Sequence, residues 1–157
     1  MSTEIPWKVA STAGPTTSWQ KLLVPTDFSA ASDAALRVAV SVARRCGARL
    51  TLLHVVDING QAPDVGSVKD GELMAAQRSD VAVKLRACAD SLVAAGLTVV
   101  PIVLEGLPCE QILCFAKAHD LVVLARPKRR NRWRWFSKRT WSAVAANSPA
   151  SVILVPV

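Results

Sequence analysis

The residues from Lys21 to Asp57 decide the fold of this chain: KLLVPTDFSAASDAALRVAVSVARRCGARLTLLHVVD. The first five, KLLVP, form an apolar run that predicts a short buried strand ending at Thr26-Asp27. From Ser29 to Cys46 the apolar residues recur at the spacing of one helix face, and Gly47 ends that helix. Arg49 to Val56 (RLTLLHVV) predicts a second buried strand. The stretch therefore reads as a strand–helix–strand unit.

The alternation of strand and helix continues along the rest of the sequence. The stretch 58–71 contains Gly and Asp and predicts a loop. Alternating elements favour an α/β fold, a parallel sheet with helices on both faces, and right-handed crossovers make the sheet doubly wound. The further expected elements are a helix at Glu72–Ala95, a strand at Leu97–Leu104, a helix from Pro108 to about His119, a strand at Leu121–Ala125, a helix from about Lys138 to Asn147 and a strand at Val152–Val157.

Composition bounds the organisation of the chain. At 157 residues and 51% hydrophobic, the chain is long enough for one domain with a good core, which we place at 21–157. No apolar run approaches the roughly 18 to 20 residues that span a bilayer. Residues 1–20 contain Glu4, Pro6 and Pro15 and lack the apolar core of a signal peptide, so we expect a mobile tail.

The cysteines and histidines favour structural roles. No cysteine pair forms a CxxC motif, and none has a histidine at metal-ligand spacing. We therefore expect reduced thiols, no metal site and a cytoplasmic protein. His54 lies inside a predicted strand and His119 at a predicted helix end, and neither forms a nucleophile–base motif in the sequence. We therefore expect that the chain has no catalytic residue and is not an enzyme. The cysteines are Cys46, Cys88, Cys109 and Cys114.

Residues 126–139, here called the basic segment, read RPKRRNRWRWFSKR. They hold eight of the 19 Lys and Arg residues and no acid. The other 11 basic residues nearly balance the 12 acidic ones, so the formal charge of +7 resides in this segment. Such a concentrated positive field attracts phosphate, nucleic acid or acidic lipid.

The basic segment and Asp27 both follow the ends of predicted strands. In doubly wound sheets, ligands bind beyond the carboxyl ends of the strands, where strand order reverses. The two meet there if the first and fourth strands are neighbours. The Asp27 carboxylate could accept hydrogen bonds from a ligand, or could bond the amides of Ser29 and Ala30 in an Asx turn. Ser29 or Ser32 can cap the helix that follows.

Four sequence features together resemble the universal stress protein family. They are the strand LLVPTDFS, the helix containing DAALRVAVSVARRCGA, the strand LTLLHVVD and the ending HDLVVLARP…SVILVPV. The resemblance covers about residues 20–157. It implies strand order 3-2-1-4-5, a cytoplasmic dimer and, in one subclass, ATP bound in the crevice at the strand ends.

The ATP-binding subclass carries Gly-x-x-Gly, nine residues, then Gly-Ser or Gly-Thr after the fourth strand. Counted back from Ser148-Pro149, those four positions fall on Ala125, Lys128, Lys138 and Arg139, and none is kept. The glycines let backbone N–H groups approach phosphate oxygens, whereas a Cβ and long side chains fill that space. We therefore expect no ATP and no other cofactor.

The other half of the family's crevice is better preserved. Pro25, Thr26, Asp27 and Val55 match positions that contact adenine and ribose in ATP-binding relatives. The resemblance thus implies a non-catalytic dimeric stress-response or signalling domain that has lost ATP binding. Its dimer is expected through the last strand, 151–157, because an exposed apolar edge strand needs a partner.

Three interpretations of the basic segment stay open. In the first, Lys128, Lys138 and Arg139 hold a phosphate or another small anion, making an anion- or nucleotide-binding protein. In the second, the segment docks the protein as a peripheral adaptor on nucleic acid or acidic lipid. In the third, the charges are a solvated face. The candidate polyanion surface of the second interpretation consists of Arg126, Arg129, Arg130, Arg132, Trp133, Arg134 and Trp135.

Overall fold

The computed structural model describes residues 19–57, 68–126 and 138–157 of the chain. Residues 1–18 of the expected tail, most of the predicted loop and the central part of the basic segment therefore lie outside the described residues. Within the described residues the chain forms five strands and four helices in strict alternation. The elements are β1 Lys21–Pro25, α1 Ala30–Cys46, β2 Arg49–Asp57, α2 Val68–Ala94, β3 Val99–Gly106, α3 Pro108–Ala116, β4 Leu121–Arg126, α4 Lys138–Asn147 and β5 Ser151–Pro156.

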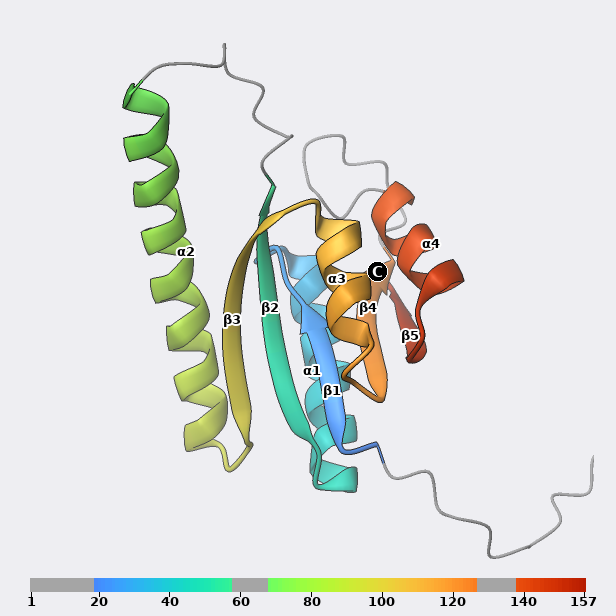
Figure 1. The fold of residues 1–157 in the computed structure, drawn as a ribbon. Helices are drawn as coiled ribbons and strands as arrows, with labels where there is room; N and C mark the ends of the chain where they lie inside the picture. The colour runs from blue at the N-terminus through green and yellow to red at the C-terminus, as the bar shows by residue number, and fades with distance from the viewer. Residues whose placement is uncertain (1–18, 58–67, 127–137) are drawn as a thin grey trace, which may run out of the picture.

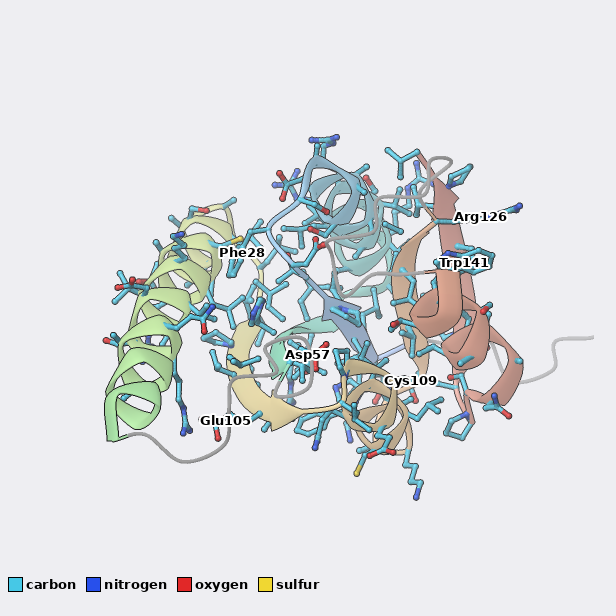
Figure 2. All side chains as sticks on the ribbon, turned by 90° about the horizontal axis from the view of Figure 1, so that it is seen from above. Phe28, Asp57, Glu105, Cys109, Arg126 and Trp141 are labelled. Atoms are coloured by element: carbon cyan, nitrogen blue, oxygen red, sulfur yellow. The ribbon has the colours of Figure 1, made fainter. Side chains whose placement is uncertain are left out.

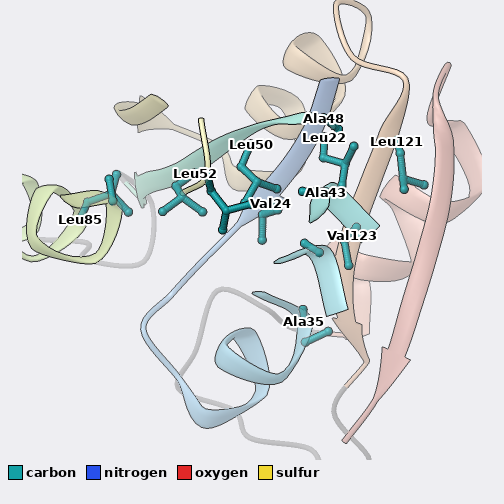
Figure 3. Close-up of a cluster of buried hydrophobic side chains, with 14 residues drawn as sticks. Leu22, Val24, Ala35, Ala43, Ala48, Leu50, Leu52, Leu85, Leu121 and Val123 are labelled. Atoms are coloured by element: carbon teal, nitrogen blue, oxygen red, sulfur yellow. The ribbon is translucent and has the colours of Figure 1, made fainter. Parts of the chain in front are cut away.

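The strands form one parallel sheet in the order β3-β2-β1-β4-β5, as predicted (Figure 1). Helices cover both faces: α1 and α2 pack on one, α3 and α4 on the other. Alternate residues of each strand therefore enter different cores. In β1, Leu22 and Val24 join the core under α1 and α2 (Figure 3), and Leu23 joins the core under α3 and α4. No helix in the described ranges is long and apolar enough to cross a membrane.

Helix α1 begins and ends as its sequence predicts. Ser29 is the N-cap, and its side chain accepts a hydrogen bond from the Ser32 amide. In turn, the Ser29 amide donates a hydrogen bond to the Ser32 hydroxyl oxygen, which completes a capping box. At the other end Gly47 adopts φ +66°, the left-handed conformation that glycine takes at little cost.

The boundaries around α2 and β3 differ from the predicted ones. Helix α2 begins at Val68, four residues before the predicted start, although Gly71 lies in its first turns. The cost of one helical glycine, about 1 kcal/mol, is evidently small beside the stability of a long helix. At the far end, Gly96 donates to Val93 O and Leu97 donates to Leu92 O. Leu97 therefore closes a Schellman motif and is buried before β3 begins at Val99.

The amino ends of β1 and β4 are tied together by Asp120. Its Oδ2 accepts hydrogen bonds from the amides of Gln20 and Lys21, each at 2.9 Å. Its backbone carbonyl accepts from Ser151, at the start of β5. One residue thus fixes three neighbouring strands at the end of the sheet opposite the predicted site.

Candidate functional site

The reversal of strand order falls between β1 and β4. Their ladder in the described residues pairs Leu22 with Leu121 and Leu23 with Val122, near the amino ends. Beyond these pairs β1 remains hydrogen-bonded to β2 as far as Pro25, and β4 to β5 as far as Arg126. The two central strands therefore part before their carboxyl ends, which is the arrangement that opens a ligand site in doubly wound sheets. Figure 2 views the molecule from this end.

The residues at the end of β1 have well-defined partners. The Thr26 amide donates to Leu53 O at 2.9 Å, which continues the β1–β2 pairing by one residue. The Thr26 hydroxyl accepts from the Phe28 amide at 3.1 Å and donates to Ser32 Oγ at 3.2 Å. Thr26 is buried, so these bonds form away from solvent.

Asp27 has one bonded and one unbonded carboxylate oxygen. Its Oδ1 accepts from the Ser29 amide at 3.0 Å, the Asx turn that was one of the two predicted roles. Its Oδ2 is buried and has no hydrogen-bond partner among the described residues. A buried acceptor without a donor is costly, and such groups in folded proteins call for an explanation. The Asx turn at Asp27 is thus present, and the second carboxylate oxygen has no hydrogen bond among the described residues.

His54 lies beneath the turn that follows β1. Its Nδ1 donates to the Thr26 carbonyl at 2.8 Å, and its ring stacks on Phe28 with the centroids 5.0 Å apart. Burial lowers the pKa of His54 from its ordinary value, although the Thr26 carbonyl and the Asp27 charge oppose that shift. The neutral imidazole therefore supports the turn, in agreement with the predicted role as a core histidine.

Phe28 is the described residue other than glycine that has a positive φ, +58°. This left-handed conformation is unfavourable for an aromatic residue, and it persists only when surrounding contacts hold it. Here two contacts hold it: the stack of the Phe28 ring on His54, and the hydrogen bond that the Phe28 amide donates to Thr26 Oγ1. Strained backbone of this kind tends to occur at ligand sites.

The side of the site formed by β4 is different. Ala125, at the first glycine position of the ATP-binding pattern, is buried and packs in the core under α1. Arg126 follows it and is exposed, and its guanidinium lies 5.4 Å from the centroid of the Trp141 ring on α4 (Figure 2). Helix α4 begins at Lys138, so Lys138 and Arg139 form its first turn, which contains no acidic residue.

The structure brings together several of the predicted site residues. Pro25, Thr26 and Asp27 lie at the end of β1, with Val55 on the neighbouring β2, where it is fully buried under α3. Ala125 and Arg126 end β4. The remaining candidates are outside the described residues: Lys128, Arg129, Arg130, Arg132, Trp133, Arg134 and Trp135.

The other groups considered in the sequence are His119 and the four cysteines. His119 lies at the amino end of β4, where Nδ1 donates to Phe115 O at 2.7 Å and Nε2 lies 2.8 Å from Thr51 Oγ1. All four cysteines are free thiols. Burial, with smaller contributions from Asp33 and Glu110, raises the pKa of Cys88 and of Cys109 respectively. The described residues contain no cluster of three or more potential metal ligands.

Three features were missed from the sequence, two of them at the site and one at the opposite end of the sheet. The positive φ of Phe28 and its stack on His54 depend on contacts between residues 26 apart, which no local pattern encodes. The Asp120 clamp likewise depends on contacts across about 100 residues. The capping box was detectable in part, since Ser29 and Ser32 have the required spacing, but serine replaces the usual Glu or Gln.

Comparison with known proteins agrees with the observed fold. The model of the universal stress protein family matches residues 18–156. Universal stress protein MJ0531 of Methanocaldococcus jannaschii is 26% identical over 145 residues, which cover 87% of this chain and 82% of that protein.

Solved structures show the same fold. Universal stress protein UspA from Lactobacillus plantarum superposes with a TM-score of 0.73 and 28% identity, covering 87% of this chain and 97% of the other. A universal stress protein in complex with cAMP superposes with a TM-score of 0.63 and 19% identity, over 88% and 98% of the two chains. Because the family model spans nearly the whole described domain, this chain belongs to the universal stress protein family.

Proposed function

We propose that this chain is a non-catalytic, dimeric member of the family in which ATP binding has been lost. The observation that carries the loss of ATP is the composition of the β4 side of the site. All four loop positions that would cradle phosphate are replaced, by Ala125, Lys128, Lys138 and Arg139.

The two sides of the site fit ATP unequally. On the β1 side, the unbonded Oδ2 of Asp27 is suited to a donor group of a base or ribose. On the β4 side, Ala125 places a Cβ in packed surroundings, and α4 opens with Lys138 and Arg139 where the pattern has glycine and a hydroxyl. Phosphate cradles of this type depend on backbone N–H groups that glycine exposes. The triphosphate therefore has no matching cradle, and we assign it no role.

Restoration of the loop tests this part of the proposal. Calorimetric titration of the wild-type protein with ATP should show no saturable binding below about 1 mM. A dissociation constant of about 1 mM corresponds to a binding free energy of roughly −4 kcal/mol, so any binding should be weaker than that. The variant with Lys128→Gly, Lys138→Gly and Arg139→Ser should bind ATP more tightly than wild type. Lys117→Gly plus Lys84→Gly, which removes two exposed lysines elsewhere, is the matched control and should leave the titration unchanged. Tight binding of ATP by the wild-type protein would contradict the proposal.

The dimer is proposed through β5. This strand forms an edge of the sheet, and its four central residues, Val152 to Val155, are apolar but only half-buried. The neighbouring β4 is buried from Leu121 to Ala125. An apolar edge with unpaired backbone groups is an aggregation hazard unless another strand covers it. Pairing of two copies across a two-fold axis is the simplest closed solution.

Sedimentation tests the dimer. The wild-type protein should sediment as a dimer at micromolar concentration. Lysine at Ile153 or Val155 should yield monomer or insoluble protein, because the charge would lie in the shared apolar face. Val100→Lys is the matched control: Val100 is 41% exposed on the opposite edge strand, β3, and this variant should remain dimeric. A monomeric wild-type protein would rule the β5 dimer out.

The absence of catalysis and a cytoplasmic location belong to the same proposal. His54 and His119, the two histidines of the chain, both make hydrogen bonds that support the fold. Four free thiols, two of them with raised pKa values, suit a reducing compartment.

A second candidate function is docking on an anionic partner, nucleic acid or acidic lipid, through the basic segment. Arg126, its first residue, favours this because its exposed guanidinium is oriented by the Trp141 ring. Neutralising Arg129, Arg130, Arg132 and Arg134 together should abolish retention on heparin and on anionic liposomes. Binding should also weaken steeply with salt. Unchanged retention of the four-arginine variant would leave the segment as a solvated face. The small-anion alternative, with Lys128, Lys138 and Arg139 as ligands, predicts saturable phosphate binding instead.

A further inference from the structure

The turn between β1 and α1 contains a strained residue that a side chain of β2 holds in place. Phe28, labelled in Figure 2, has φ +58°, a left-handed conformation that an aromatic residue rarely adopts. Its ring stacks on His54, with the ring centroids 5.0 Å apart and the ring planes 22° apart. His54 Nδ1 also donates a hydrogen bond of 2.8 Å to the Thr26 carbonyl of the same turn. The conformation of the turn therefore depends on the state of His54.

These contacts belong to the neutral form of His54. Nδ1 carries a proton because its partner is a carbonyl oxygen, so Nε2 is unprotonated in the neutral ring. His54 is only 8% exposed. Burial lowers its pKa, and the Thr26 hydrogen bond and the Asp27 charge oppose that shift. Protonation adds a second ring N–H and a positive charge in surroundings that disfavour charge.

The acidic groups beside His54 come from the turn and from β3. Glu105 lies two residues beyond Val103, the register partner of His54, and its carboxylate is paired with Arg78 of α2 at 2.9 Å. Asp27 Oδ1 accepts from the Ser29 amide, whereas its buried Oδ2 has no hydrogen-bond partner among the described residues. Asp27 is therefore the acidic group of this set that still has an oxygen to offer.

The helices that cover this face of the sheet add no buried charge in their described side chains. The thiol of Cys88 on α2 is half-buried, and burial raises its pKa, with a smaller contribution from Asp33. The thiol is therefore neutral in the acid range. The other charged side chains are exposed: Asp33, Arg37, Arg44 and Arg45 on α1, and Asp80, Lys84, Arg86 and Asp90 on α2.

Protonation of His54 therefore acts against the strained turn. Water or the Asp27 carboxylate can stabilise the charged ring, and Asp27 Oδ2 is not bonded to His54 in the neutral state. Either partner draws the ring away from Phe28. Phe28 then loses a contact that holds its left-handed backbone, and strained residues persist only where their surroundings hold them.

We propose that His54 and Phe28 form a pH-sensitive switch, in which the neutral ring holds the turn from Thr26 to Ser29 and the protonated ring releases it. Release disorders the β1 side of the site while the sheet stays folded. The switch depends neither on the loss of ATP binding nor on the dimer, so its test is independent of theirs.

Hydrogen–deuterium exchange at pH 7.5 and 5, followed by NMR and corrected for the intrinsic pH dependence of exchange, tests the switch. The Phe28 and Ser29 amides report on the turn, because they donate to Thr26 Oγ1 and Asp27 Oδ1. Their protection in the wild-type protein should fall about tenfold in acid, because the released turn binds a proton below the ordinary histidine pKa of 6.5 and the observed turn does not. The amides of β4, which is buried from Leu121 to Ala125, report on the whole sheet and should keep their protection.

Three variants separate the switch from other effects of acid. His54→Phe keeps a ring for the stack, and His54→Gln keeps a donor for the Thr26 carbonyl, but neither can be protonated. In both variants the protection of the turn should be equal at the two pH values. Phe28→Gly keeps a titrating histidine and places at 28 the residue that adopts a positive φ without help. Its turn should be equally protected at the two pH values, although less than in wild type.

Four results would overturn the proposal. The first is a wild-type turn whose protection is the same at both pH values. The second is a fall in acid that persists in His54→Phe and His54→Gln, because another group then responds to the pH. The third is a fall in Phe28→Gly as large as in wild type, which would show that the strain at 28 is not involved. The fourth is an equal fall in the β4 amides, because acid then unfolds the whole sheet.

Discussion

The carboxyl ends of β1 and β4 face the same switch point but are built in different ways. At the end of β1, Thr26, Ser29 and Ser32 form a buried network of short hydrogen bonds. At the end of β4, Arg126 is exposed and is oriented by one ring contact with Trp141. Under the proposed function, the first region offers polar groups to a base or ribose, and the second lacks the glycines of the ATP-binding pattern. The proposal therefore assigns the two regions different roles.

The largest effect is expected from the β1 network. Ser32→Ala removes a buried hydroxyl that donates to Ser29 O and accepts from the Ser29 amide. Loss of these bonds should lower the free energy of unfolding by about 1–2 kcal/mol. Ser41→Ala is the matched control on the same helix, because its hydroxyl is exposed and donates to Arg37 O. It should stay within about 0.5 kcal/mol of wild type in a denaturant titration. Equal effects would show that the turn is not specially stabilised.

The next effect is a pH dependence from His54. Its native pKa lies below the ordinary value of 6.5 because burial disfavours the charged ring. As pH falls below 6.5, His54 binds a proton in the unfolded chain but not yet in the native state. The free energy of unfolding therefore decreases until the pH reaches the native pKa. Above 6.5 the histidine contributes no pH dependence.

Denaturant midpoints between pH 7.5 and 5 measure this dependence. His54→Gln is neutral throughout and can still donate to the Thr26 carbonyl, so part of the slope between pH 6.5 and 5 should disappear in that variant. An identical slope in the two proteins would mean that other groups account for the pH dependence.

The smallest effect is expected on the β4 side. The contact between Arg126 and Trp141 involves an exposed guanidinium, so its coupling energy should be about 0.5–1 kcal/mol. A double-mutant cycle with Arg126→Gln and Trp141→Leu measures it. A coupling energy larger than the loss of unfolding free energy caused by Ser32→Ala would reverse the comparison between the two regions.

The parallel sheet was predictable because the sequence alternates apolar strands with capped helices, whereas its strand order was implied by the resemblance to the universal stress protein family. The runs KLLVP and RLTLLHVV leave little choice of element, and Gly47 ends α1 where expected. The start of α2 was harder to place, because Gly71 weakens the helix signal of Val68 to Gly71 without preventing the helix.

The candidate site was predictable only in outline. The Asx turn at Asp27 follows from local sequence, because the Ser29 amide that donates to the Asp27 carboxylate is two residues away. The unbonded state of Oδ2 and the stack of Phe28 on His54 do not, because they depend on how distant segments pack. Sequence identifies which groups reach the switch point, whereas packing determines which of them stay unsatisfied.

Native mass spectrometry of the purified protein tests the central claim most directly, because it reports oligomeric state and bound nucleotide together. The expected spectrum is that of a dimer without ATP, before and after ATP is added at micromolar concentration. A spectrum in which each protomer carries one ATP would contradict the claim that the substitutions at 125, 128, 138 and 139 have removed the phosphate cradle.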